Sequence, residues 1–154
     1  MADERPLSTG IDPDVDLRVP EERAESLHLL RVTLAVAAGG VLGALARHGV
    51  AEAWPAAPTG FPWATFVVNV SGCLALGALM GWVAGREGAH PLVRPFLGTG
   101  LLGGYTTFST YVVETQERFD EPLLALGYLA GSVVIGLAAA LVGWALTARR
   151  RGTR

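Results

Sequence analysis

Four long apolar stretches, separated by short polar or proline-rich segments, dominate the chain between residues 29 and 148. They run from Leu29 to Ala51, from Phe61 to Ala84, from Leu92 to Thr115 and from Pro122 to Ala148. A helix that crosses a bilayer needs roughly 20 mostly apolar residues. The pattern therefore predicts an all-α membrane protein with four transmembrane helices, short loops and no separate soluble domain.

The third stretch differs from the others because glycines and threonines crowd its middle, between Gly98 and Thr110. Such a composition disfavours a uniform helix, so we expect a broken third helix, with the break near Gly103 and Gly104. Unwound backbone at membrane depth is tolerated only where it binds an ion or lines water. A kinked helix that satisfies itself through Ser and Thr side chains is the structural alternative.

Hydroxyl groups and aromatic rings share the turn that follows this expected break. The residues concerned are Thr106, Thr107, Phe108, Ser109, Thr110 and Tyr111. Aromatic ring edges carry positive potential and hydroxyls donate hydrogen bonds, so both groups can face an anion. The segment is therefore the first candidate for a binding site.

Single polar residues in the other stretches also need partners. Burying an unpaired Arg47 would cost at least about 2.5 kcal/mol, so it pairs with protein or water, or it snorkels to the interface. Asn69 must face protein or a pore, and a hydrogen bond between helices is the commoner role. Tyr128 and Ser132, four residues apart, form a short hydroxyl stripe on one helix face.

Small residues recur at a spacing of four along three of the stretches. Lipid provides no hydrophobic drive between helices, so close backbone approach at such positions predicts tight helix packing. The residues are Ala35, Gly39 and Gly43, then Gly77, Gly81 and Gly85, and finally Gly127 and Gly131.

Charged residues gather at the two ends of the chain. Eleven of the 26 lie in residues 1–28 and four arginines lie in residues 149–154, which leaves eleven for the 120 residues between. We expect a disordered acidic N-terminal tail over 1–28, the transmembrane domain over 29–148 and a basic C-terminal tail over 149–154. The net charge of −2, without any lysine, offers no basic surface for nucleic acid.

The centres of the four stretches carry no Asp, Glu or His. Proton-coupled transport normally needs a titratable group at depth, so the pattern favours passive conduction. A small proton-coupled drug exporter would need a carboxylate in the first stretch, and a subunit that only packs other proteins would not need unwound backbone. The sequence also lacks a catalytic triad, a metal-ligand spacing and a phosphate loop, so an enzyme is not expected.

Three segments of the chain resemble motifs of the small four-helix fluoride channels known as the Fluc or CrcB family. They run from Gly39 to Arg47, from Phe66 to Gly72 around Asn69, and from Gly103 to Tyr111. Their order and spacing cover essentially everything between the two tails. The third motif is the most specific of the three.

The resemblance implies an antiparallel dimer with two fluoride pores and a central structural sodium ion held by backbone carbonyls. Those carbonyls belong by position to Gly103 and Thr106, with Arg47, Gly104 and Thr107 in structural or interface roles. The implied pore residues are Asn69, Phe108, Ser109, Thr110, Tyr111, Tyr128 and Ser132. Donors and ring edges without a fixed charge suit a small, strongly hydrated anion that must also leave. Tyr111 stands where the family usually has Phe, which leaves the fluoride throughput open.

Arginines are distributed unevenly between the two expected sides of the cell membrane. The side of the termini carries nine near the span ends, and the other side carries only Arg118. The nine are Arg18, Arg23, Arg31, Arg86, Arg94, Arg149, Arg150, Arg151 and Arg154. This bias predicts that both termini are cytoplasmic. An antiparallel dimer then requires a second, oppositely oriented homologue, so we expect a heterodimer.

Overall fold

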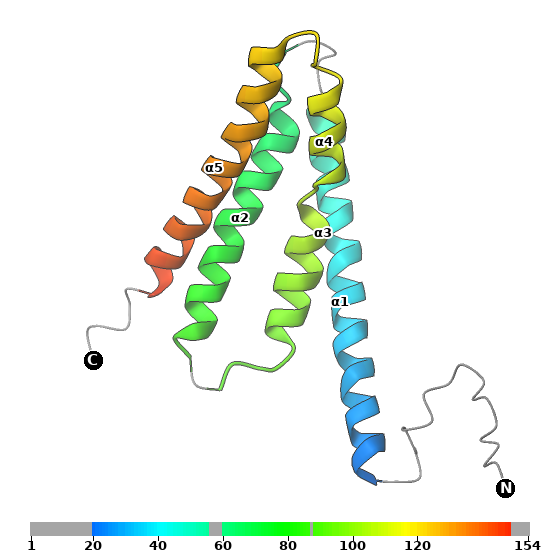
Figure 1. Cartoon of the computed structure of the whole chain (residues 1–154). Coiled ribbons are helices and arrows are strands. Elements are labelled where there is room, and N and C mark those ends of the chain that lie inside the picture. The colour runs from blue at the N-terminus through cyan, green and yellow to red at the C-terminus, as the bar shows by residue number, and fades with distance from the viewer. Residues whose placement is uncertain (1–19, 56–59, 87, 149–154) are drawn as a thin grey trace, which may run out of the picture.

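The computed structural model describes residues 20–55, 60–86 and 88–148, and these residues form helices and turns without a strand. Figure 1 shows the helices side by side, alternating in direction along the chain. The elements are α1 (Pro20–Ala53), α2 (Trp63–Ala84), the π-helical segment η1 (Arg94–Leu102), α3 (Gly103–Tyr105), α4 (Ser109–Gln116) and α5 (Pro122–Ala148). Residues 1–19 and 149–154, which include most of the two expected tails, lie outside the described residues.

Three of the helices are long and apolar enough to cross a membrane. They are the part of α1 from Arg23 to Ala53, all of α2 and all of α5. The prediction of an all-α membrane protein is therefore confirmed at this level. The bounds of α5 coincide with the fourth predicted stretch, whereas the third predicted stretch is divided among η1, α3 and α4.

The first helix begins earlier than the sequence predicted. We expected a disordered tail up to residue 28, but α1 starts at Pro20 and is 34 residues long. Proline suits the first helical position because its fixed φ is helical and its missing N–H has no partner there anyway. Strong helix formers such as Ala24 and Leu27 follow it, so helix propensity extends the helix beyond the apolar stretch.

The helices pack as two close pairs, α1 with η1 and α3, and α2 with α5. Glycines allow the helices of each pair to pack closely. A Cβ added to Gly43 would meet the carbonyl oxygen of Leu101, and one added to Gly77 would meet that of Ala140. Gly39 and Gly81 also face backbone, so the predicted packing is confirmed for α1 and α2.

The prediction for the glycines of α5 is wrong within the described chain. Gly127 and Gly131 have nothing within 4 Å of an added Cβ. Gly143, at the other end of α5, contacts α2 instead, because a Cβ there would meet the carbonyl oxygen of Leu74. Spacing alone identified small residues but could not say which of them face a neighbour.

Helical conformation continues through Gly103 and Gly104, where the sequence predicted a break. It stops after Tyr105, because Thr106 is extended with φ of −76° and ψ of 159°, and it resumes at Ser109. The shift has a packing reason. Gly104 lies against α1, where an added Cβ would meet the carbonyl oxygen of Gly40. This glycine therefore allows α3 to pack closely on α1.

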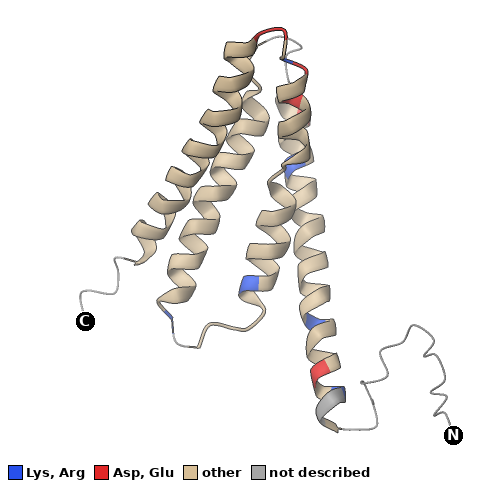
Figure 2. Cartoon of the chain, in the orientation of Figure 1, with Lys and Arg blue, Asp and Glu red and all other residues tan. Residues whose placement is uncertain are grey.

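The bundle has two distinct ends. The start of α1, the end of α5 and the connection from α2 to η1 all lie towards one end of the bundle, which we call the terminal end (Figure 1). The segment before α2 and the turn between α4 and α5 lie at the opposite end. Figure 2 shows that charged residues gather at these two ends, with few between them.

Candidate functional site

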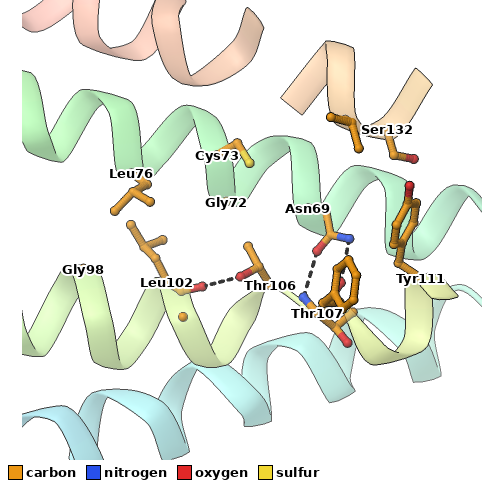
Figure 3. A pocket seen from close by; sticks show the side chains of 13 residues that line it. Asn69, Gly72, Cys73, Leu76, Gly98, Leu102, Thr106, Thr107, Tyr111 and Ser132 are labelled. Carbon is orange, nitrogen blue, oxygen red and sulfur yellow. Dashed lines mark hydrogen bonds between the residues drawn. The ribbon is translucent and has the colours of Figure 1, made fainter. Parts of the chain in front are cut away.

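Asn69 on α2 binds the backbone of Thr107, inside the interruption between α3 and α4 (Figure 3). Its Nδ2 donates to the carbonyl oxygen of Thr107 at 2.9 Å, and its Oδ1 accepts from the Thr107 N–H at 2.8 Å. One side-chain amide therefore satisfies both polar groups of an unwound residue. Of the two roles that the sequence left open for Asn69, a hydrogen bond between helices is present, and its second amide N–H remains available to donate.

The interruption releases several carbonyl groups from the helical hydrogen-bond pattern, among them those of Gly103 and Thr106. In a continuous helix, the N–H groups of Thr107 and Thr110 would bind the carbonyls of Gly103 and Thr106. Here the Thr107 N–H donates to Asn69, and the Thr110 N–H donates to the hydroxyl of Thr107 at 3.2 Å. The two carbonyls that the family resemblance assigns to a cation are thus among those that lose their helical donors; the carbonyls of Gly104 and Thr107 accept from Arg47 and Asn69 instead.

The Thr107 side chain also stabilises the start of α4. Its hydroxyl accepts from the Thr110 N–H and donates to Thr110 Oγ1 at 3.0 Å, and its Oγ1 lies 3.4 Å from Ser109 Oγ. This is the capping geometry that Thr provides at a helix start. The hydroxyls of Ser109 and Thr110 therefore both contact Thr107.

A pocket of about 320 Å³ opens beside the interruption, between α2, α5 and the η1–α3–α4 segment (Figure 3). Seven of the predicted site residues line it, and none of its lining residues is charged. The seven are Asn69, Gly103, Thr106, Thr107, Phe108, Tyr111 and Ser132, and the remaining lining is largely apolar, with Gly72, Cys73, Leu76, Gly98, Leu102 and Val133. Ser109, Thr110 and Tyr128 lie outside this pocket.

Phe108 and Ser132 stand out among the residues that line the pocket. The Phe108 side chain is 77% exposed, and its ring centroid lies 5.9 Å from that of Tyr111. Among the described residues, Ser132 Oγ is a buried polar atom without a hydrogen-bond partner. Buried hydroxyls are normally satisfied, so this one is available to a ligand or to water in the pocket.

The hydroxyl of Tyr111 is bound to protein. It donates to the carbonyl oxygen of Leu129 on α5 at 2.5 Å, and the Tyr111 side chain is buried. The ring still lines the pocket, so only the phenolic group is withdrawn from it. The added hydroxyl of this chain is therefore used to attach α4 to α5.

Arg47 has a protein partner at the same level of the bundle. Its Nε donates to the carbonyl oxygen of Gly104 at 3.3 Å, and the residue is half-buried. With Thr65, Thr107 and Thr110, Arg47 lines a smaller pocket of about 60 Å³ between α1, α2 and α4. Of the two sequence interpretations, pairing with protein describes Arg47 better than snorkelling.

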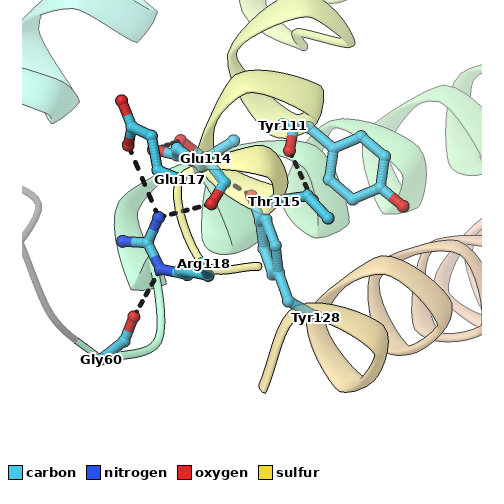
Figure 4. A network of polar contacts seen from close by, with 8 residues as sticks. Gly60, Tyr111, Glu114, Thr115, Glu117, Arg118 and Tyr128 are labelled. Carbon is cyan, nitrogen blue, oxygen red and sulfur yellow. Dashed lines mark hydrogen bonds and ion pairs between the residues drawn. The ribbon is translucent and has the colours of Figure 1, made fainter. Parts of the chain in front are cut away.

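A second polar network lies towards the opposite end of the bundle and centres on Glu114 (Figure 4). The buried Glu114 carboxylate accepts from Thr65 Oγ1 and from the Tyr128 hydroxyl, both at 2.8 Å. The Tyr128 hydroxyl is therefore bound to Glu114, whereas Ser132, which was expected to share a hydroxyl stripe with Tyr128, lines the pocket. The sequence did not predict this network, although Thr65 is a polar residue within the second apolar stretch and Glu114 lies near the end of the third.

Comparison with known proteins identifies the family of the chain. The model of the CrcB-like protein family (camphor resistance, CrcB) matches residues 34–144. The fluoride-specific ion channel FluC 2 of Nocardia farcinica is 50% identical over 127 residues, which cover 78% of this chain and 91% of that protein. FluC 2 of Streptomyces avermitilis is 46% identical, over 83% of this chain and 82% of that protein. FluC of Paracoccus denitrificans is 47% identical, over 71% and 89% respectively. The chain therefore belongs to the CrcB family.

Proposed function

We propose that this chain is a fluoride-specific ion channel, which exports fluoride passively across the cell membrane and so lowers cytoplasmic fluoride and its toxicity. Relatives that share 42–50% of their residues with it carry the name fluoride-specific ion channel. The observation that carries the proposal in the chain itself is the pocket at the interruption, where an amide, a buried hydroxyl and ring edges meet without a charged side chain.

The chemistry of these groups suits fluoride. Conduction requires replacing the hydration shell while keeping each site weak enough for the ion to leave. The free N–H of Asn69 and the hydroxyl of Ser132 can donate hydrogen bonds, and the exposed ring of Phe108 offers its positive edge. A membrane potential, inside negative, moves an anion outward with about 2.3 kcal/mol per charge per 100 mV, so coupling to another ion is not required.

We further propose that η1, α3 and α4 together form a broken third transmembrane helix in an antiparallel dimer. Their combined range, 94–116, matches the third apolar stretch and runs between the two ends of the bundle. The exposed Phe108 beside the pocket supports a second subunit that completes the pore there. An aromatic side chain at a site of ion passage is better explained by such a partner than by lipid alone.

A structural sodium ion at the dimer centre fits the residues present. The Gly103 and Thr106 carbonyls, whose helical donors bind elsewhere, are oxygen ligands of the kind that unwound helices offer to sodium. Bound there, the ion would neutralise the carbonyl dipoles of both subunits and hold them together. Thr106 would act through its backbone, because its hydroxyl already donates to the Leu102 carbonyl at 3.0 Å.

The orientation proposal rests on the arginine asymmetry between the two ends of the bundle. Arg86 and Arg94 border the connection from α2 to η1 at the terminal end, and Arg31 lies towards the start of α1. The arginines of 149–154 follow α5 in the sequence and lie outside the described residues. We propose that both termini are cytoplasmic and that the inverted subunit is a separate homologue. A C-terminal tag in cells that express this chain alone should be reached from the inside only. Equal labelling from both sides would restore a dual-topology homodimer.

The function is tested with liposomes that contain only this protein, or this protein with an inverted homologue. Potassium fluoride is loaded inside, the pH is equal on both sides, and a fluoride electrode records efflux. A passive channel moves charge, so efflux should start only when valinomycin lets potassium follow. Chloride-loaded liposomes should retain their anion. Efflux that needs no valinomycin, or chloride efflux as fast as that of fluoride, would contradict the proposal.

A further inference from the structure

Arg118 joins the end of α4 to the segment that leads into α2 (Figure 4). Its side chain is only 5% exposed. Nη1 donates to the carbonyl oxygen of Glu114 at 2.6 Å, and Nε donates to that of Gly60 at 2.7 Å. Gly60 lies 58 residues away in sequence and has a φ of 104°, a conformation that favours glycine. One guanidinium thus holds the backbones of two segments together.

The short helix α4 depends on such links for its position. It has eight residues, too few for a stable helix on its own, and it packs less extensively on α2 and α5 than these two pack on each other. Asn69 binds the residues before its first turn, and Thr65 binds Glu114 near its middle. Arg118 supplies the link at its C-terminal end, where backbone carbonyls lack helical donors and a cation is favoured.

The two bonds to backbone carbonyls connect Arg118 to α4 and to the segment before α2. Arg118 also forms an ion pair with Glu117, whose Oε2 lies 3.7 Å from Nη1, and the Glu117 side chain is 63% exposed. Solvent screens such a surface pair, so it adds little. The hydrogen bonds from Arg118 to the two carbonyl oxygens are shorter than this ion pair, and the Arg118 side chain is almost completely buried.

We propose that Arg118 is a positioning residue for conduction, which fixes α4 so that the Glu114 carboxylate keeps both of its hydroxyl donors, Thr65 and Tyr128. The proposal rests on the proposed channel function. The planar fork of arginine reaches Gly60 and Glu114 at once, through Nε and Nη1. A lysine ammonium on a flexible chain cannot reproduce both directions, so the role is specific to arginine.

The first test compares fluoride efflux per protein in four variants. Arg118→Met should lower the rate at least about fivefold, the effect of losing roughly one hydrogen bond, and Arg118→Lys should restore only part of it. Glu117→Gln removes the ion pair, and Arg86→Met removes an exposed arginine at the terminal end. Both controls should stay within about twofold of the unmodified protein, as surface changes do. A rate for Arg118→Met within that range, or an equal loss in Glu117→Gln, would overturn the proposal.

The second test asks whether Arg118 acts through Glu114. Arg118→Met is combined with Glu114→Gln, and amide hydrogen exchange of 109–116 is measured in the four proteins of the cycle. Arg118→Met should speed exchange in α4 while α2 and α5 stay protected, and this effect should shrink when Glu114 is already changed. A uniform rise in exchange rate across all helices would mean a general structural role for Arg118 and would overturn the proposal. An effect of Arg118→Met on exchange that is equal with and without Glu114→Gln would overturn it as well.

The two readouts separate this inference from the channel proposal. Hydrogen exchange reports the attachment of α4 whether or not the protein conducts. Efflux missing from the unmodified protein, both alone and together with the inverted homologue, would refute the channel function and with it the conducting role of Arg118. The exchange result would then still decide whether Arg118 holds α4 in place.

Discussion

The side-chain amide of Asn69 takes the place of a helical turn for Thr107. It accepts from the Thr107 N–H at 2.8 Å and donates to the Thr107 carbonyl at 2.9 Å, across 38 residues of sequence. The interruption between α3 and α4 is therefore stabilised by one residue on a neighbouring helix. The same exchange of partners leaves the Gly103 carbonyl without its helical donor, which links the shape of the backbone to its capacity to hold a cation.

Asn69→Asp should abolish fluoride efflux and destabilise the protein. The carboxylate can still accept from the Thr107 N–H, but it cannot donate to the Thr107 carbonyl, and it places a negative charge beside the anion path. Losing the donor leaves a carbonyl unsatisfied, which costs about 1–3 kcal/mol. Efflux from liposomes and thermal unfolding in detergent test both effects. Ser71→Ala, two residues further along α2, serves as the control, and normal fluoride flux through Asn69→Asp would refute the assignment.

Tyr111→Phe should leave fluoride efflux within about twofold of the unmodified protein, since the phenolic hydroxyl is bound to the Leu129 carbonyl and not free in the pocket. The variant keeps the ring that lines the pocket. It loses one hydrogen bond between α4 and α5, worth about 0.5–1.5 kcal/mol of unfolding free energy. Strong loss of flux with unchanged stability would show that the hydroxyl itself contacts the ion.

Gly77→Ala should destabilise the packing of α2 on α5 by about 1–3 kcal/mol, because its methyl group would meet the backbone of Ala140 and force the helices apart. Gly127→Ala is the matched control, with open space around the added Cβ. Alanine also favours a helix over glycine by up to about 1 kcal/mol, so this variant should be neutral or more stable. Thermal unfolding in detergent measures both. An equal loss for Gly127→Ala would reveal a neighbouring subunit at that face.

Replacing sodium with N-methylglucamine should lower the unfolding temperature and the dimer fraction, and adding sodium should restore both. Binding at 100 times the dissociation constant stabilises by about 2.7 kcal/mol. Thr106→Ser should respond as the unmodified protein does, because serine keeps the carbonyl and the hydroxyl bond to Leu102 and loses only the methyl group near Gly72. Stability that is indifferent to sodium would contradict the proposed cation site.

The sequence by itself determined the membrane character of the chain and most of its helices. Hydrophobicity over some 20 residues is a local property, so the extent of α5 followed from the sequence without correction and α2 needed a shift of only two residues at its start. Composition also located the irregular third stretch, and burial logic singled out Arg47 and Asn69, since a polar group at membrane depth must find a partner.

Only the tertiary structure decided which partners these residues find. The helix stops at Thr106 rather than at Gly103 because Asn69 binds the next residue and Gly104 is needed against α1. Tyr128 donates a hydrogen bond to Glu114, and Arg118 donates one to Gly60. These contacts join residues 14 to 58 positions apart, and the packing of whole helices sets them. Local pattern cannot specify such pairs, because the orientation of each helix depends on glycines and side chains of its neighbours.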